Sequence, residues 1–359
     1  TKGGFGLKWK SGDTRPAEAK QTTKFINHLK PKTTMTYLEN SKQYTGSDLE
    51  NIFFRPMLTG ESAQDLGVRV LYNMPQPTHV QLWDGQRNIL QKFTSAGWAG
   101  GKAATKYEKT VNLNRVKAEL GFSAANYFSM VYEKVSSLVN THMDDLSGTE
   151  LEQAETALFK QALAENIRVT MWIGDTSAAS GYNTFDGLLK RINGLVDDDG
   201  VYNFSYQAAA LEDPAYAVEL FDKLWAGADP RIPGLKADDR LAYFVSSDIY
   251  RLYEKYLDAK GADAAYADAM NGRRTLAYHG IPVVDVRLGS YLGATSFRQS
   301  FVMLTDRRNL VLAVNTADMP GNEVRMWYNP DEMENRQRAV FMAGTQILDE
   351  ALISFAYKQ

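Results

Sequence analysis

The chain has 359 residues, of which 44% are hydrophobic and 23% charged, a composition typical of folded globular proteins. Its formal net charge of -3 gives no overall basic field that would indicate a nucleic-acid-reading protein. It contains no cysteine, which excludes disulfides, thiolate metal sites and cysteine nucleophiles and favours cytoplasmic assembly, and no apolar run approaches the ~18 residues of a membrane span.

Residues 1–45 have the pattern of an extended arm. Phe5, Leu7 and Trp9 alternate with glycine and lysine, so their side chains share one face of an extended segment. Such an arm cannot bury these three side chains against itself. We therefore expect them to contact a neighbouring surface.

Residues 46–112 are predicted to be extended β structure. Apolar and polar side chains alternate along 68–74, further strand-like runs follow, and Asp84-Gly85 is a hairpin turn signal. The glycine-rich stretch 97–101, which includes Trp98, interrupts the pattern. The region has few core-forming residues for its length, which favours a projecting hairpin or a small insertion over a self-sufficient domain.

A helical pattern is predicted over 113–138, and a clearer one over 149–173. Thr149 and Glu152 form a capping box for the second helix, its apolar residues fall near one face, and Gly174 ends it. At 1.5 Å per residue this helix would be about 37 Å long, which is typical of a strut that crosses a domain.

The rest of the chain alternates between the two kinds of element. Helices are predicted at 214–225 and 248–257, and strands at 241–246, 281–286, 310–313, 323–328 and 338–342. Strands that alternate with helices indicate a mixed α/β unit. The run 323–328 alternates charged and apolar residues, as in a half-solvated hairpin.

Patterns that would indicate chemistry are weak. The histidines are His28, His79, His142 and His279, and no two of them have metal-ligand spacing. Residues 97–102 lack the spacing and the Ser or Thr of a phosphate loop. The acidic run 197–199 could bind a divalent cation, but a solvated turn is favoured because calcium-loop spacing is missing. We therefore predict no catalytic, cofactor-binding or metal-binding residue, and a protein that is not an enzyme.

Three stretches occur in a specific order. The first is Trp172-Ile173-Gly174-Asp175-Thr176 at the end of the long helix; the second is the strand at 242–246, its following helix and the Gly280-Ile281-Pro282-Val283 strand; the third is the pair of runs at 309–328 and 338–344. In this order and spacing the chain resembles the major capsid proteins of tailed bacteriophages, which share the Hong Kong 97 fold. The resemblance covers roughly residues 30–359.

The resemblance implies an α+β chain with four parts. They are an N-terminal arm (1–45), an extended loop (46–112), a peripheral domain with a spine helix at 149–173 (113–200 and 309–347), and an axial α/β domain (201–308 and 348–359). Phe5, Leu7, Trp9 and Trp98 would be inter-subunit contacts.

The resemblance also implies a function in assembly. Copies of the chain would form homo-pentamers and homo-hexamers of an icosahedral shell that encloses double-stranded DNA non-specifically, without a membrane. Portal, scaffolding protein, maturation protease and decoration proteins would be partners, and the shell would assemble in the host bacterial cytoplasm to become the virion capsid. No cofactor is implied.

Two alternatives stay open. An encapsulin-type nanocompartment has the same fold and holds a protein cargo, although the arm and the large extended region favour the viral interpretation. A soluble α/β enzyme with an unrecognised site is the second alternative. An enzyme would remain a small oligomer, whereas a shell protein forms capsomers or larger particles.

Overall fold

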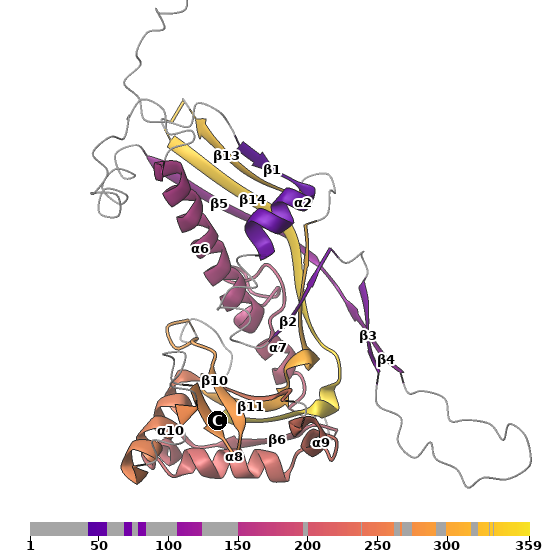
Figure 1. Cartoon of the computed structure of the whole chain (residues 1–359), viewed down its shortest axis with the longest axis vertical. Coiled ribbons are helices and arrows are strands. Elements are labelled where there is room, and N and C mark those ends of the chain that lie inside the picture. The colour runs from indigo at the N-terminus through magenta and orange to yellow at the C-terminus, as the bar shows by residue number, and fades with distance from the viewer. Residues whose placement is uncertain are drawn as a thin grey trace, which may run out of the picture.

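The structure is a computed structural model. It describes residues 42–55, 68–73, 78–83, 106–123, 150–196, 200–237, 239–261, 266–267, 275–291, 299–316, 322–329, 331–332 and 334–359. Two bodies, each built on a β-sheet, are joined by a long helix and by strands that pass from one sheet to the other (Figure 1).

The first body contains a six-stranded sheet. Its strands are β1 (Lys42–Tyr44), β2 (Arg69–Tyr72), β5 (Asn114–Ser123), β12 (Leu310–Asn315), β13 (Glu323–Asn329) and β14 (Glu334–Ile347). β14 is the central strand: β5 pairs with one edge, and β13 followed by β12 pairs with the other. β1 extends the sheet beyond β13, and β2 extends it beyond β12. The predicted strands at 310–313, 323–328 and 338–342 are thus confirmed, and the last is longer than predicted.

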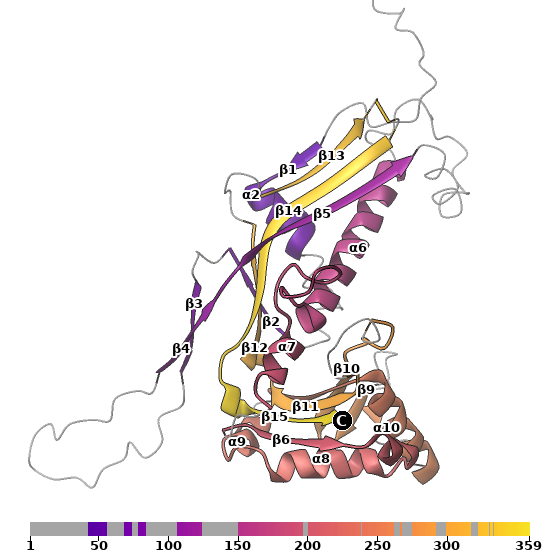
Figure 2. The ribbon, with the colours of Figure 1, turned by 180° about the vertical axis from the view of Figure 1, so that it is seen from behind.

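Helix α6 (Glu150–Ile173) lies along one face of this sheet (Figure 2). It starts one residue later than predicted and ends at the predicted residue. Phe159, Leu163 and Ile167 are buried at intervals of four residues, which places them on a single helical face towards the sheet. An amphipathic helix is thus confirmed, although Leu158 and Ala162, which we expected on its apolar face, are only partly buried.

The segment that follows β1 is helical. Residues 46–54 form α2 (Gly46–Asp48) and the wider turn η2 (Leu49–Phe54), where extended structure was predicted. Leu49, Phe53 and Phe54 are fully buried, and the Phe54 ring lies 4.9 Å from the Phe341 ring of β14. The prediction was wrong because these apolar residues recur at helical spacing, which buries three of them together against the sheet.

The predicted helix over 113–138 is also wrong in its described part, which is strand β5. Val116, Ala118 and Leu120 pack towards the core, whereas Lys117 and Glu119 are exposed. This is a period of two, and pairing along β14 overrides the weak helical preference of the segment. Residues 124–138 lie outside the described part of the chain.

The second body contains a seven-stranded sheet in the order β6-β15-β11-β7-β10-β9-β8. Its strands are β6 (Tyr202–Tyr206), β7 (Leu241–Val245), β8 (Tyr266–Ala267), β9 (Thr275–Tyr278), β10 (Ile281–Asp285), β11 (Phe301–Asp306) and β15 (Ile353–Lys358). The predicted strands at 241–246 and 281–286 are confirmed as β7 and β10, which pair in parallel.

Both faces of this second sheet are covered, which explains why β7 is an uninterrupted apolar run. Tyr243 and Val245 pack in the cluster that includes helices α8 (Tyr216–Ala226) and α10 (Ser247–Lys260), whereas Phe244 packs in the cluster shared with α6. α8 and α10 confirm the helices predicted at 214–225 and 248–257. A short helix, α9 (Ile232–Lys236), also packs on this sheet.

A two-stranded ribbon, β3 (Thr78–Trp83) with β4 (Lys106–Val111), extends away from both bodies (Figure 1). Trp83 pairs with Lys106, so residues 84–105 connect the strands, and the turn predicted at Asp84-Gly85 lies outside the described residues. The base of the ribbon packs on the first sheet, because Val80 and Val111 are buried with Val311 of β12.

Candidate assembly surfaces

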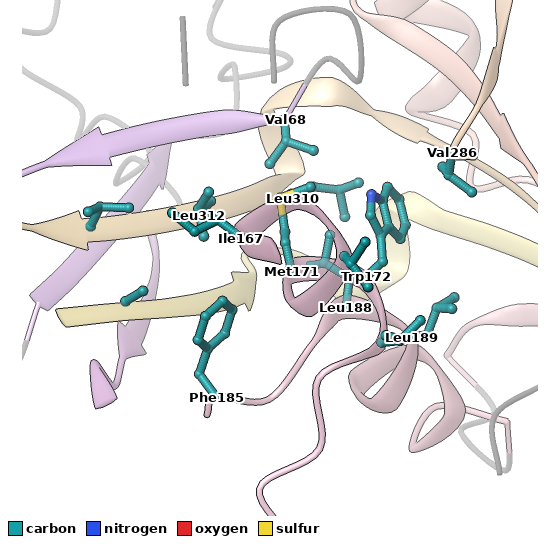
Figure 3. Close-up of a cluster of buried hydrophobic side chains, with 14 of the residues drawn as sticks. Val68, Ile167, Met171, Trp172, Phe185, Leu188, Leu189, Val286, Leu310 and Leu312 are labelled. Carbon is teal, nitrogen blue, oxygen red and sulfur yellow. The ribbon is translucent and has the colours of Figure 1, made fainter. Parts of the chain in front are cut away.

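The two bodies meet around the end of helix α6. Trp172 is fully buried, and its ring lies 5.6 Å from that of Phe244 and 6.1 Å from that of Phe301, both in the second sheet. Figure 3 shows Trp172 between Val286 on one side and Leu188 and Leu189 of helix α7 (Leu188–Asn193) on the other. A single aromatic side chain of the helix therefore joins the cores of the two bodies.

The chain crosses itself closely just after this point. A Cβ on Gly174 would lie 2.2 Å from the carbonyl oxygen of Phe185, and one on Gly187 would lie 2.5 Å from the Gly174 nitrogen. Gly187 N–H also donates to the Gly174 carbonyl at 2.8 Å. Only glycine permits the two backbones to approach this closely, which fixes the turn from α6 into α7.

A group of charged side chains closes the same turn. Lys190 Nζ lies 2.7 Å from Asp175 Oδ1 and 2.6 Å from Asp186 Oδ1. The hydrogen bond from Lys190, with those from Ser177, lowers the pKa of Asp175 to about 2. Burial alone would lower the pKa of Lys190, but its hydrogen bonds to the two carboxylates outweigh burial and raise that pKa. These ion pairs hold the turn in one shape at neutral pH.

A second connection between the bodies lies one helical turn earlier. Arg168 Nη1 donates to the Val286 carbonyl at 2.7 Å, and Tyr291 Oη donates to Glu165 Oε1 at 3.0 Å. The hydrogen bond from Arg168 to Glu165 lowers the pKa of that carboxyl group. Helix α6 therefore contacts the second body through charged groups as well as through Trp172.

Two strands pass directly from one sheet to the other. β11 leads into β12 through the turn Arg307–Asn309, and β14 leads into β15 through Glu350–Leu352. The turns are bonded to each other: Asn309 Nδ2 donates to the Asp349 carbonyl at 2.7 Å, and Asp349 N–H donates back to Asn309 Oδ1 at 2.7 Å. Arg231 Nη1 pairs with the Asp349 carboxylate at 2.8 Å. Because Arg231 directly precedes α9, this ion pair holds the start of α9 beside the turn between β14 and β15.

The ribbon β3–β4 is attached at this junction too. Lys109 Nζ lies 2.6 Å from Glu350 Oε1, and Gln346 Nε2 donates to the Thr110 carbonyl at 2.9 Å. A Cβ on Gly344 would lie 2.2 Å from the Asn112 carbonyl oxygen, so β14 and the end of β4 approach without a side chain between them. The base of the ribbon is thus rigidly held while the remainder extends outwards.

An apolar groove of about 530 Å³ lies between strand β5 and helix α6. Five consecutive residues of β5, 116–120, line one side, and Phe159, Ala162 and Leu163 of α6 line the other. On the opposite face of the sheet, Arg338 Nη2 donates to Glu323 Oε1 at 2.7 Å.

The residues predicted to make inter-subunit contacts, Phe5, Leu7, Trp9 and Trp98, lie outside the described residues, as does the acidic run 197–199. His79 is exposed on β3, 3.2 Å from Glu108, and His279 lies in a turn with φ +48°. Within the described ranges no three His, Asp or Glu side chains are placed to hold a metal ion. The helices of those ranges include none long and apolar enough to cross a membrane.

No protein-family model and no curated protein matches the chain. A chain of the satellite phage P4 procapsid, which includes the size determination (Sid) protein, does match in structure. The alignment covers 96% of this chain and 98% of that one, with a TM-score of 0.53 and 11% sequence identity. The chain has a Hong Kong 97-type capsid fold.

Other solved structures align less closely with this capsid fold. The alignment with a chain from the capsid of a native GTA particle covers 83% of this chain and 89% of that one, with 15% identity and a TM-score of 0.47. The alignment with a chain of an encapsulin complex from Synechococcus elongatus covers 80% of this chain and 84% of that one, with 10% identity and a TM-score of 0.40. The α+β class expected from the sequence agrees with the capsid fold. The groove was not predicted, although charged and apolar residues alternate along 115–120.

Proposed function

We propose that the chain is the major capsid protein of a tailed phage, a structural subunit that is not an enzyme. Copies would assemble into pentamers and hexamers of an icosahedral shell around double-stranded DNA, and this shell would be the capsid of the virion. The observation that carries the proposal is the match to a procapsid chain over nearly the whole length of both molecules. The shape supports it, because a ribbon that extends from both bodies leaves surface that a single copy does not bury.

Under this proposal, residues 201–308 and 348–359 form the axial domain. This assignment is supported because all the strands of the seven-stranded sheet lie within these two separate stretches. The peripheral domain would be 113–200 and 309–347, with α6 as the spine helix. The extended loop would be β3–β4 with the residues between them, since the helical residues 46–54 pack into the core of the first body.

Neighbouring copies and other phage proteins would be the partners of this subunit. The arm (1–45) and the extended loop, with Phe5, Leu7, Trp9 and Trp98, would contact neighbouring copies. Portal, scaffolding protein and maturation protease would take part in assembly of the shell in the host cytoplasm, and decoration proteins would bind the shell. Contact with DNA would be non-specific, in accord with the slightly negative net charge of the chain.

Expression of the chain alone and together with the phage assembly genes, followed by sedimentation and electron microscopy, tests the proposal. We expect closed icosahedral particles or capsomers that protect DNA from nuclease. Particles that hold a protein cargo and no DNA would favour the encapsulin alternative. A chain that remains a monomer or small oligomer under both conditions would refute the shell and favour the enzyme alternative.

A further inference from the structure

Strand β5 is the outermost strand on its side of the six-stranded sheet. All ten of its residues pair with β14, and in the described part of the chain it pairs with nothing else. An unpaired strand edge presents a row of N–H and C=O groups that can pair with another extended segment. A long, regular edge of this kind is a docking position for a strand.

The apolar groove opens along this same edge. Val116, Ala118 and Leu120 point towards α6, so their side chains line the groove. Lys117 and Glu119 also line it, although both are exposed and form a 2.9 Å ion pair on the opposite face. Neighbouring side chains of a strand point to opposite faces, so consecutive residues can all line one groove only through their backbone atoms. The groove therefore extends to the free edge of β5.

The arm carries the matching pattern. Phe5, Leu7 and Trp9 alternate along five residues, the same length as the stretch 116–120 that lines the groove. A strand added to β5 would place these three side chains beside Val116, Ala118 and Leu120, because residues on one face of a strand repeat every two positions. The edge supplies backbone hydrogen bonds, and the groove supplies apolar burial.

We propose that the arm of a second copy of this chain adds a strand to the free edge of β5 and buries Phe5, Leu7 and Trp9 in the β5–α6 groove. This inference rests on the proposed function, in which neighbouring copies surround every subunit. Residues 10–41 separate these side chains from β1, and extended they would span up to about 105 Å. α6 is only about 36 Å long, so the arm can reach well beyond its own body.

Disulfide trapping in assembled particles tests the inference, because the chain contains no cysteine that would interfere. Leu7→Cys is combined with Ala118→Cys: each is the middle residue of its triplet, so they face each other in both strand directions. The matched control combines Leu7→Cys with Lys117→Cys, whose side chain points to the opposite face. Opposed residues of neighbouring strands fall within disulfide distance, so we expect about tenfold more disulfide-linked dimer from the first pair.

Each outcome has one meaning. A dimer band from the first pair and little from the control supports the inference. A disulfide within single chains would mean that the arm folds back onto its own groove, and equal or absent crosslinking of both pairs would mean that no strand docks; either result overturns the inference. Normal particles with either of these results would overturn the inference alone, whereas wild-type protein that forms no particles would overturn the proposed function.

Hydrogen exchange in particles identifies any other occupant. If the arm covers β5, deletion of residues 1–16 should raise the exchange rate of peptides from 114–123 in the capsomers or shells that remain. A control substitution, Gly234→Ala, whose Cβ would meet no atom within 4 Å, should leave this rate unchanged. Unchanged protection of β5 after removal of the arm would show that another segment fills the groove and would overturn the inference.

Discussion

Trp172 offers the sharpest test of how the two bodies are joined. Its side chain has 0% exposure, and its ring contacts those of Phe244 and Phe301 in the second sheet. Replacing a fully buried Trp or Phe by Ala typically costs about 3–5 kcal/mol of unfolding free energy, from lost apolar burial and the cavity that remains. We expect Trp172→Ala to fall in this range.

The conservative variant Trp172→Phe separates packing from hydrogen bonding. Among the described residues the indole Nε1–H of Trp172 is buried and has no hydrogen-bond partner. A buried polar group without a partner costs about 1–3 kcal/mol, so its removal should offset part of the volume lost with the larger ring. We therefore expect Trp172→Phe to destabilise the chain by less than about 1.5 kcal/mol.

Urea denaturation of the disassembled subunit, followed by circular dichroism, measures both variants against the wild type. A larger loss for Ala than for Phe, by about 2 kcal/mol or more, is the expected result. Equal losses would refute the reasoning, because they would mean that the aromatic packing which Phe retains contributes nothing to stability.

Three further predictions concern the turn after α6 and the arm. Gly187→Ala should destabilise the subunit by about 1–3 kcal/mol in the same assay, since its Cβ would meet a backbone nitrogen at 2.5 Å, whereas Gly234→Ala, with nothing within 4 Å, should be neutral or slightly stabilising. The pKa of Asp175, lowered to about 2 chiefly by its hydrogen bond from Lys190, is below the unfolded value of about 3.9. Its stabilisation is thus complete above pH ~4 and is lost as the pH falls through 2; Asp175→Asn should flatten this part of a stability-versus-pH curve, and an unchanged curve would contradict the assignment. Deletion of residues 1–16 should leave the circular dichroism of the subunit native but abolish stable shells; intact shells from this deletion would contradict the role of the arm.

The parts of the fold that were predicted correctly are those whose signal is local. The sequence of helix α6 carries a capping pattern, apolar side chains at helical spacing and a glycine after its end, so its predicted bounds were within one residue. β7 is a continuous apolar run, which predicts a strand buried on both faces whatever lies beside it.

The parts that were missed depend on distant partners. Residues 115–120 alternate charged and apolar side chains, but only β14 makes this stretch a strand rather than the start of a helix. Trp83 pairs with Lys106, a partner distant in sequence that the local pattern cannot reveal. The groove needs helix α6 beside β5, and the alternation along 115–120 does not show locally which helix lies there.

The two sheet-to-sheet connections have a mechanical consequence. Because β11 continues into β12 and β14 into β15, tension along the long axis of the subunit runs through two covalent backbones side by side. Stretching the molecule would require backbone extension and not only the loss of side-chain contacts. The two turns are bonded to each other through Asn309 and Asp349, so a change of curvature at this junction has to move both connections together.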